Sequence, residues 1–250
     1  MQWWEAAIIA LAGLWAGLIN AVVGSGTLVT FPVLVALGYS PVTATTSNAI
    51  GLITGSITGA VGYRSELAGE GRRLARYSVA SLLGAVGGTV LLLSLPADAF
   101  ETIVPVLVGI SVVLVLVQPL LARRLGDRAA ADRTGSPLLY VLIFLVGVYG
   151  GYFAAAQGIL LVGLMGLLLA DPLQRLNAFK NTLAAVVNLV AGVIYAFVAP
   201  VSWPVVAILA TSSIVGGLLG ASVGKRLSPT VLRGAIVVIG VAAVVHLLLE

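Results

Sequence analysis

The chain has 250 residues, of which 60% are hydrophobic and 9% are charged, and it contains no cysteine. An average soluble domain is about 25% charged, so this composition excludes a soluble globule and predicts an all-α integral membrane protein. The sequence pI is near 9.7. Lysine and arginine gathered on one membrane face explain that value without a nucleic-acid partner, and the lack of cysteine excludes disulfides and thiolate metal sites.

Apolar stretches follow one another along the chain, and their lengths decide how each can cross a bilayer. A span takes about 20 apolar residues, which six stretches provide: 43–63, 76–95, 101–121, 177–198, 203–223 and 230–249. Two further stretches, 4–37 and 137–170, are too long for one span and short for two. Each is interrupted near its middle, by Gly24-Ser25-Gly26 or by Gln157-Gly158. Because glycine weakens a helix interior, each stretch is either one tilted helix or two short helices forming a hairpin.

The positive charges distinguish these two topologies, because lysine and arginine in short loops mark the cytoplasmic face. If each long stretch crosses once, five of the 13 positive residues fall on the wrong side: Arg175, Lys180, Lys225, Arg226 and Arg233. If each long stretch returns to the side it entered, all 13 are cytoplasmic. The count favours two hairpins in a multi-pass protein of the cell (inner) membrane, with both termini outside.

The two halves of the chain share a glycine and asparagine pattern. Gly17 and Gly151 are separated by 134 positions, as are Gly24 and Gly158, whereas the pairs Asn48/Asn181 and Gly59/Gly192 are separated by 133. We therefore predict a first membrane repeat at 1–122, a cytoplasmic linker at 123–136 and a second repeat at 137–250. Each repeat is a broken, re-entrant hairpin plus three transmembrane helices. Because three is odd, the repeats are inverted, an arrangement typical of transporters with a midplane site and alternating access.

Two sequence segments carry a resemblance to a known family. Residues 17–32 read GLINAVVGSGTLVTFP and residues 38–48 read GYSPVTATTSN. They resemble the TauE/SafE (sulfite exporter) permeases, and RLNAFKN at 175–181 is similar to the second-half counterpart in that family. The resemblance covers essentially the whole chain. It implies a secondary transporter or facilitator of small sulfur-containing anions such as sulfite or organosulfonates.

The first predicted break is the strongest candidate for a binding site. A half-helix that begins there would present backbone N–H groups and the positive end of its dipole to a cavity, and such N-termini bind anions. The hydroxyl and amide groups around it would add donors. The candidate residues are Asn20, Gly24, Ser25, Gly26 and Thr27. The alternative is that the glycines serve as a kink or a close-packing point between helices.

Further candidates follow in both halves. In the first half, Thr45, Ser47 and Asn48 open a predicted span, where they either cap a helix or line a site. In the second half the candidates are Gln157 and Gly158 at the break, and Lys180, Asn181 and Asn188 in the next span. Lys180 lies near the end of its span, so its side chain either snorkels to the cytoplasmic surface or neutralises part of a substrate's charge.

The acidic residues lie only at the ends of the apolar stretches or between them. Coupling through a membrane-embedded carboxylate is therefore disfavoured, and so is a cationic substrate. The sequence has no catalytic triad pattern, metal-ligand cluster or phosphate-binding loop, so we expect no enzyme activity, no metal and no cofactor. The expected partners are a small anionic substrate and the lipid bilayer. The sequence is also compatible with a homo-oligomer. The alternative function is a membrane subunit or scaffold that transports nothing.

Overall fold

The computed structural model describes residues 1–126, 134–223, 234, 236–242 and 244–245, and this part of the chain is built from helices. The α-helices are α1 (Trp3–Val22), α2 (Thr27–Ala36), α3 (Pro41–Gly51), α4 (Ile53–Gly62), α5 (Gly71–Ser94), α6 (Ala97–Gly126), α7 (Pro137–Tyr152), α8 (Gln157–Leu168), α9 (Leu173–Val198) and α10 (Trp203–Val223). A 3-10 helix, η1 (Arg64–Leu67), lies between α4 and α5. The expectation of an all-α protein is confirmed for the described residues.

Several of these helices match a membrane in length and surface. Among the described residues, α1, α5, α6, α9 and α10 are long and apolar enough to cross a bilayer, while α2, α7 and α8 are shorter. Large apolar side chains such as Val106, Leu218 and Phe197 are exposed on the outside of the bundle. A soluble monomer rarely exposes apolar surface on this scale. The chain is an integral, multi-pass membrane protein.

Four predicted spans lie within single helices, and one does not. The stretches 76–95, 101–121, 177–198 and 203–223 lie within or close to the bounds of α5, α6, α9 and α10. The stretch predicted as a span at 43–63 is divided between two helices, because α3 ends at Gly51 and α4 begins at Ile53. Leu52 still donates its N–H to Asn48 and accepts from Ser56, so the junction is a kink rather than a loop. The span predicted at 230–249 lies mostly outside the described residues; those described within it are helical.

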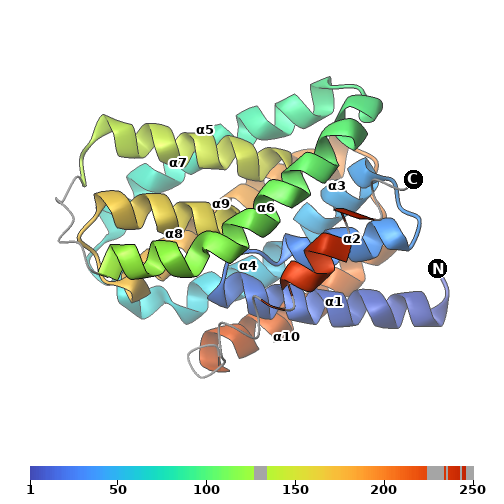
Figure 1. Cartoon of the computed structure of the whole chain (residues 1–250), viewed down its shortest axis with the longest axis horizontal. Helices are drawn as coiled ribbons and strands as arrows, with labels where there is room; N and C mark the ends of the chain where they lie inside the picture. The colour runs from blue at the N-terminus through green and yellow to red at the C-terminus, as the bar shows by residue number, and fades with distance from the viewer. Residues whose placement is uncertain (127–133, 224–233, 235, 243, 246–250) are drawn as a thin grey trace.

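Both long apolar stretches are interrupted near the predicted positions, although the second interruption lies just before Gln157 and Gly158, which begin α8. The first break, residues 23–26, separates α1 from α2, and the second break, residues 153–156, separates α7 from α8. Figure 1 shows α1 running inward from the end that holds the N-terminus and α2 returning toward that end, while α7 and α8 do the same from the opposite end. The two turning points meet, because the Gly158 N–H donates to the Gly24 carbonyl at 3.0 Å.

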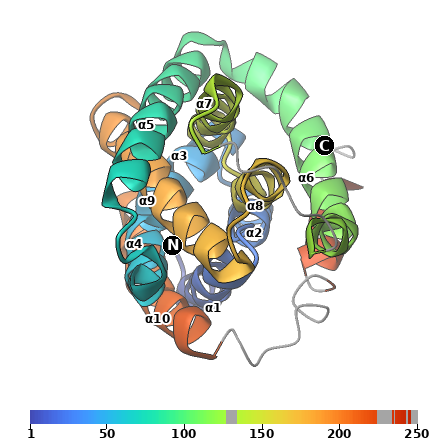
Figure 2. The ribbon, with the colours of Figure 1, turned by 90° about the vertical axis from the view of Figure 1, so that its left-hand side faces the viewer.

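Glycines set how closely the two hairpins approach the remaining helices. α1 packs along α10, and α7 packs along α5. A Cβ at Gly17 would lie 2.4 Å from the Ser213 carbonyl oxygen, and one at Gly151 would lie 2.3 Å from that of Ala85. Only glycine permits such an approach of helix backbones. Viewed nearly end-on in Figure 2, α2 and α8 lie among the longer helices.

The described connections fall at two ends of the molecule. Residues 63–70 and 169–172 lie at one end, and residues 37–40, 95–96 and 199–202 lie at the other (Figure 1). We call the first the arginine-rich end, because the segments 64–76 and 169–175 bring Arg64, Arg72, Arg73, Arg76 and Arg175 there. The predicted hairpin topology requires such a gathering. The positive residues Arg128, Arg133, Lys225, Arg226 and Arg233 lie outside the described residues.

Candidate functional site

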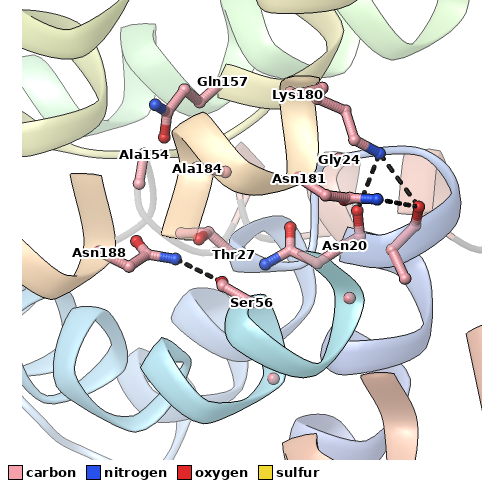
Figure 3. Close-up of a pocket in the computed structure, with 14 residues that line it drawn as sticks. Asn20, Gly24, Thr27, Ser56, Ala154, Gln157, Lys180, Asn181, Ala184 and Asn188 are labelled. Atoms are coloured by element: carbon pink, nitrogen blue, oxygen red, sulfur yellow. Dashed lines mark hydrogen bonds between the residues drawn. The ribbon is translucent and has the colours of Figure 1, made fainter. Parts of the chain in front are cut away.

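A polar cavity lies where the two breaks meet (Figure 3). Its free space is small, because the centre of a water molecule can occupy only about 20 Å³ of it. Its walls come from both breaks and from α1, α2, α4, α8 and α9. The lining residues are Asn20, Ala21, Gly24, Thr27, Gly55, Ser56, Gly59, Ala154, Gln157, Gly158, Lys180, Asn181, Ala184 and Asn188. The cavity thus draws on both halves of the sequence.

Lys180 is the charged side chain of this cavity, and it is buried, with 1% of its surface exposed. Its Nζ donates to the carbonyl oxygens of Asn20 and Ala21, each at 3.1 Å. These carbonyls belong to the last turn of α1, and a positive charge is favourable at a helix C-terminus. The snorkelling expectation for Lys180 is therefore wrong, because residues 178–181 of α9 are buried rather than open to a surface.

Three carboxamides tie the helices together around Lys180. The Asn181 Nδ2 donates to the Ala21 carbonyl at 3.3 Å, and the Asn188 Nδ2 donates to the Ser56 hydroxyl at 2.8 Å. At the first break, the Oδ1 of Asn20 accepts the Gly26 N–H at 2.9 Å. These contacts join α9 to α1 and α4. They place amide groups from two helices, α1 and α9, around one cavity (Figure 3).

The second break supplies a side chain with an unmet hydrogen-bonding group. Gln157 is 3% exposed, and its Nε2 has no partner among the described residues. The amide lies against Gly150, where an added Cβ would come within 2.5 Å of the Gln157 Cδ. A buried donor without an acceptor costs about 1–3 kcal/mol. Since Gln157 lines the cavity, a bound molecule or water is the natural acceptor for its amide.

The backbone of the second break is held in an uncommon conformation. Ala154 and Ala156 have φ values of 64° and 58°, a left-handed conformation that costs a residue with a Cβ about 1–2 kcal/mol. Ala154 also lines the cavity. At the first break the left-handed position is Gly24, with φ 89°, which glycine adopts without this cost.

The structure brings eight of the predicted site residues to the cavity and leaves five outside its lining. The eight are Asn20, Gly24, Thr27, Gln157, Gly158, Lys180, Asn181 and Asn188; the five are Ser25, Gly26, Thr45, Ser47 and Asn48. Asn48 donates to Thr27 at 3.2 Å and accepts from Thr30, so it supports a cavity residue. The hydroxyls of Ser25 and Thr45 are buried and have no partner among the described residues.

The expectation that the helix N-termini offer their N–H groups to a ligand needs revision. The Gly26 N–H is bound to Asn20, and the Gly158 N–H is bound to Gly24. These two donors are used within the protein. The remaining polar contacts that the cavity can offer come chiefly from side chains.

Sequence reasoning missed six lining residues: Ala21, Gly55, Ser56, Gly59, Ala154 and Ala184. Five are glycine or alanine, which carry no chemical signal of a site. Ser56 had a usable signal, because it precedes Asn188 by 132 positions, close to the repeat offset. Ser56 and Asn188 contact each other, as Gly24 and Gly158 do.

The cavity combines one cationic side chain with amide and hydroxyl groups, and its lining residues include no acid and no histidine. Such a lining favours an anion with several hydrogen-bond acceptors. Among the described residues there is no cluster of metal-ligating side chains.

Comparison with known proteins agrees with this membrane architecture. A probable membrane transporter protein of Haemophilus influenzae is 25% identical over 233 residues, covering 93% of this chain and 90% of that protein. The probable membrane transporter protein YfcA of Escherichia coli K12 is 27% identical over 214 residues, covering 85% and 76%. The probable membrane transporter protein ORF9 of a Sinorhizobium species is 22% identical over 246 residues, covering 98% and 92%.

The family described as sulfite exporter TauE/SafE matches residues 9–247 of this chain. The match spans both breaks and every residue that lines the cavity. The chain therefore belongs to the sulfite exporter TauE/SafE family of membrane transporters.

Proposed function

We propose that this protein is a secondary transporter or facilitator that moves small sulfur-containing anions, of the sulfite or organosulfonate type, across the cell membrane. The observation that carries the proposal is the polar cavity between the two breaks, where Lys180 is the charged member of the lining. The family description supplies sulfite. The cavity itself supports the sign of the substrate's charge and a need for several hydrogen-bond acceptors.

Lys180 supplies the positive charge that lowers the free-energy cost of burying an anion in the cavity. Transferring an ion out of water is costly unless it is paired and hydrogen-bonded. In the described state, the Nζ is held by two carbonyl oxygens of α1 and no carboxylate of the described residues lies within ion-pair distance. An entering anion takes the place of those neutral oxygens beside the ammonium group, and the Gln157 amide donates to it. The same charge repels cations.

Contacts between equivalent residues support the inverted repeat. Gly24 touches its equivalent Gly158, 134 positions later, and Ser56 touches Asn188, whose equivalent at the offset of 133 is Gly55, next to Ser56. Equivalent residues meet in this way only near a two-fold axis. The helix packing agrees, since α1 of the first half lies on α10 of the second, and α7 of the second lies on α5 of the first.

Alternating access follows from that symmetry. The repeats 1–122 and 137–250, joined by the linker 123–136, rock against each other and open the cavity to one side at a time. The arginine-rich end faces the cytoplasm by the positive-inside rule. The N-terminus is at the opposite end in Figure 1, so it lies outside the cytoplasm, and we place the C-terminus there too. The membrane we propose is the inner membrane of the cell.

A pair of matched ligands tests the proposal on purified protein. Methanesulfonate and dimethyl sulfone are similar in size, but only the first is charged. Binding to the native state raises its stability, so we expect methanesulfonate and sulfite to raise the melting temperature by about 2–4 °C, and dimethyl sulfone to leave it unchanged. Counterflow of the stabilising anion in proteoliposomes then measures transport. A folded protein that neither binds nor moves these anions would instead be a membrane subunit or scaffold.

A further inference from the structure

Four charged residues form a compact network at the arginine-rich end, which we call the ionic cluster: Glu70, Arg73, Asp171 and Arg175. Arg73 binds Asp171 through Nη2 at 2.5 Å and Glu70 through Nη1 at 2.9 Å. Arg175 Nη1 lies 3.2 Å from Asp171 and 3.4 Å from Glu70. Each arginine therefore contacts both acids, and the cluster carries no net charge.

The ionic cluster joins the two halves of the chain. Glu70 and Arg73 lie at the start of α5, whereas Asp171 and Arg175 lie between the end of α8 and the first turn of α9. A further contact between the halves is the hydrogen bond from the Arg175 Nε to the Glu66 carbonyl at 3.3 Å. The side chains are partly shielded, from 9% exposed for Asp171 to 35% for Arg175. Shielding of this kind strengthens ion pairs relative to open surface pairs.

The cluster lies next to the wall of the polar cavity. The Arg73 guanidinium stacks over the Phe179 ring, with its Cζ 5.2 Å from the ring centroid. Phe179 is fully buried and directly precedes Lys180 in α9. A movement that carries Arg73 away from Asp171 and α9 therefore also removes a packing contact from the residue next to Lys180.

A related junction at the opposite end is neutral. There the Thr46 hydroxyl donates to the Pro200 carbonyl at 2.5 Å, and the Ser202 N–H donates to the Ser47 hydroxyl at 2.9 Å. Thr46 and Ser47 occupy the positions equivalent to Phe179 and Lys180, 133 residues earlier. Each junction thus joins the early part of one equivalent helix to a connection in the other half. Only the junction at the arginine-rich end is ionic.

We propose that the ionic cluster is the gate that closes the polar cavity at the arginine-rich end, and that it breaks when the cavity opens there. The inference rests on the proposed alternating access. When the repeats rock apart at this end, the start of α5 must leave the start of α9, and the ion pairs between them are the contacts that oppose this step. The neutral junction closes the opposite end.

Asp171 makes the shorter of the two ion pairs that link the halves, 2.5 Å to Arg73 against 3.4 Å between Glu70 and Arg175. Burial alone would raise the pKa of its carboxyl, but hydrogen bonds and charge from Arg73 and Arg175 outweigh burial and hold the pKa below its ordinary value. The carboxylate is therefore ionised at neutral pH. Neutralising it leaves two arginines facing Glu70 alone, which weakens the closed state.

The chain contains no cysteine, so a single introduced cysteine reports access to the cavity. We place it at Ala184, which lines the cavity, and apply a membrane-impermeant thiol reagent to vesicles of known orientation. In the Ala184→Cys background, Asp171→Asn is expected to speed labelling from the arginine-rich side about tenfold. Asp98→Asn, which neutralises an exposed acid at the start of α6, is the matched control and leaves the rate unchanged. The gate proposal is contradicted if Asp171→Asn leaves the labelling rate unchanged, or if it raises that rate equally from both sides of the membrane.

A second variant separates gating from damage to the fold. Exchanging the partners, Arg73→Asp together with Asp171→Arg, keeps the cluster neutral and is expected to return labelling toward the slow rate. If the exchanged protein labels as fast as Asp171→Asn, the pair does not act as a gate. Labelling needs no substrate, so failure of sulfite flux leaves this test intact. Conversely, if the protein transports sulfite while Asp171→Asn leaves the labelling rate unchanged, that result rules out the gate and leaves the proposed function standing.

Discussion

The two breaks occupy equivalent places in the chain, yet they are held by different chemistry. At the first break, the Ala21 carbonyl accepts from Lys180 Nζ at 3.1 Å and from Asn181 Nδ2 at 3.3 Å. Its equivalent is Ala155, 134 positions later. The Ala155 carbonyl accepts from the Tyr149 hydroxyl at 2.6 Å and from the Ser111 hydroxyl at 3.2 Å. A cation and an amide hold one break, and two neutral hydroxyls hold the other.

Under the proposed inverted repeat, the two halves share the arrangement of helices but not the charge. The position equivalent to Lys180 is Ser47, 133 residues earlier, and its hydroxyl accepts the Ser202 N–H at the opposite end. One lysine gives the cavity a net positive charge while the other half keeps a neutral contact.

The largest expected effect comes from removing the charge at the first break. Lys180→Met should lower anion flux about hundredfold, because the substrate would be buried without a counter-charge. Tyr149→Phe removes a donor from the equivalent carbonyl at the second break and should change flux by less than about threefold. Flux is measured in proteoliposomes and normalised to folded protein.

Lys180→Arg provides the control for packing, because it keeps the charge while altering the shape of the side chain. It should retain more flux than Lys180→Met. If Lys180→Met transports normally, or if Tyr149→Phe is equally damaging, the chemical difference between the breaks has no role in transport.

The contact between the breaks gives the next effect. A Cβ added at Gly24 would lie 2.7 Å from the Gly158 Cα, and one added at Gly158 would lie 2.6 Å from the Gly24 Cα. Both alanine substitutions overpack the same contact, at a cost of about 1–3 kcal/mol. Gly24 also has φ 89°, so Gly24→Ala should lose about 1–2 kcal/mol more than Gly158→Ala. Unfolding in detergent compares them, and equal losses would show that the left-handed conformation at Gly24 carries no cost.

Removing the side-chain amide at each break should have smaller effects, which fall on stability at the first break and on anion affinity at the second. Asn20→Ala removes the acceptor of the Gly26 N–H and should cost about 1 kcal/mol of stability. Gln157→Ala removes an Nε2 that has no partner among the described residues, so stability should hardly change while anion affinity falls about fivefold. Titrations of the anion-dependent melting temperature separate the two readouts. If Gln157→Ala lowers stability and leaves anion affinity unchanged, Gln157 supports the fold and does not bind the anion.

Much of the fold follows from local features of the sequence. Glycines at 24, 26 and 158 within apolar stretches of unusual length predicted both breaks, because span length and glycine are properties of the chain itself. The positive charges predicted that the connections 63–70 and 169–172 share one end, as they do. The kink at Leu52 escaped prediction, since no proline or polar break marks it and α10 packs against Gly51 from outside the segment.

The candidate site was less predictable, because it depends on which helices meet. Lys180 lies near the end of a predicted span, so snorkelling was the reasonable expectation; its burial depends on the preceding helix α8 and on α1, which is remote in sequence. Ser47 and Asn48 were chosen for their polarity, yet they bind the α9–α10 connection and α2 instead of lining the cavity. Residue type identified polar positions, but not the side each one faces.

The smallest effect concerns the second break, where alanine rather than glycine takes the left-handed conformation. Ala156 has φ 58°, whereas its buried neighbour Ala155 is not among the residues with positive φ. Either substitution to glycine removes a buried methyl and adds flexibility to the unfolded chain, together about 1–2 kcal/mol. At Ala156 the relief of about 1–2 kcal/mol of backbone strain offsets that loss. Ala156→Gly should therefore stay within about 0.5 kcal/mol of the parent protein, and Ala155→Gly should lose about 1–2 kcal/mol in the same unfolding assay. Equal losses would mean that the second break holds its alanines without strain, and that the two breaks differ in side-chain chemistry alone.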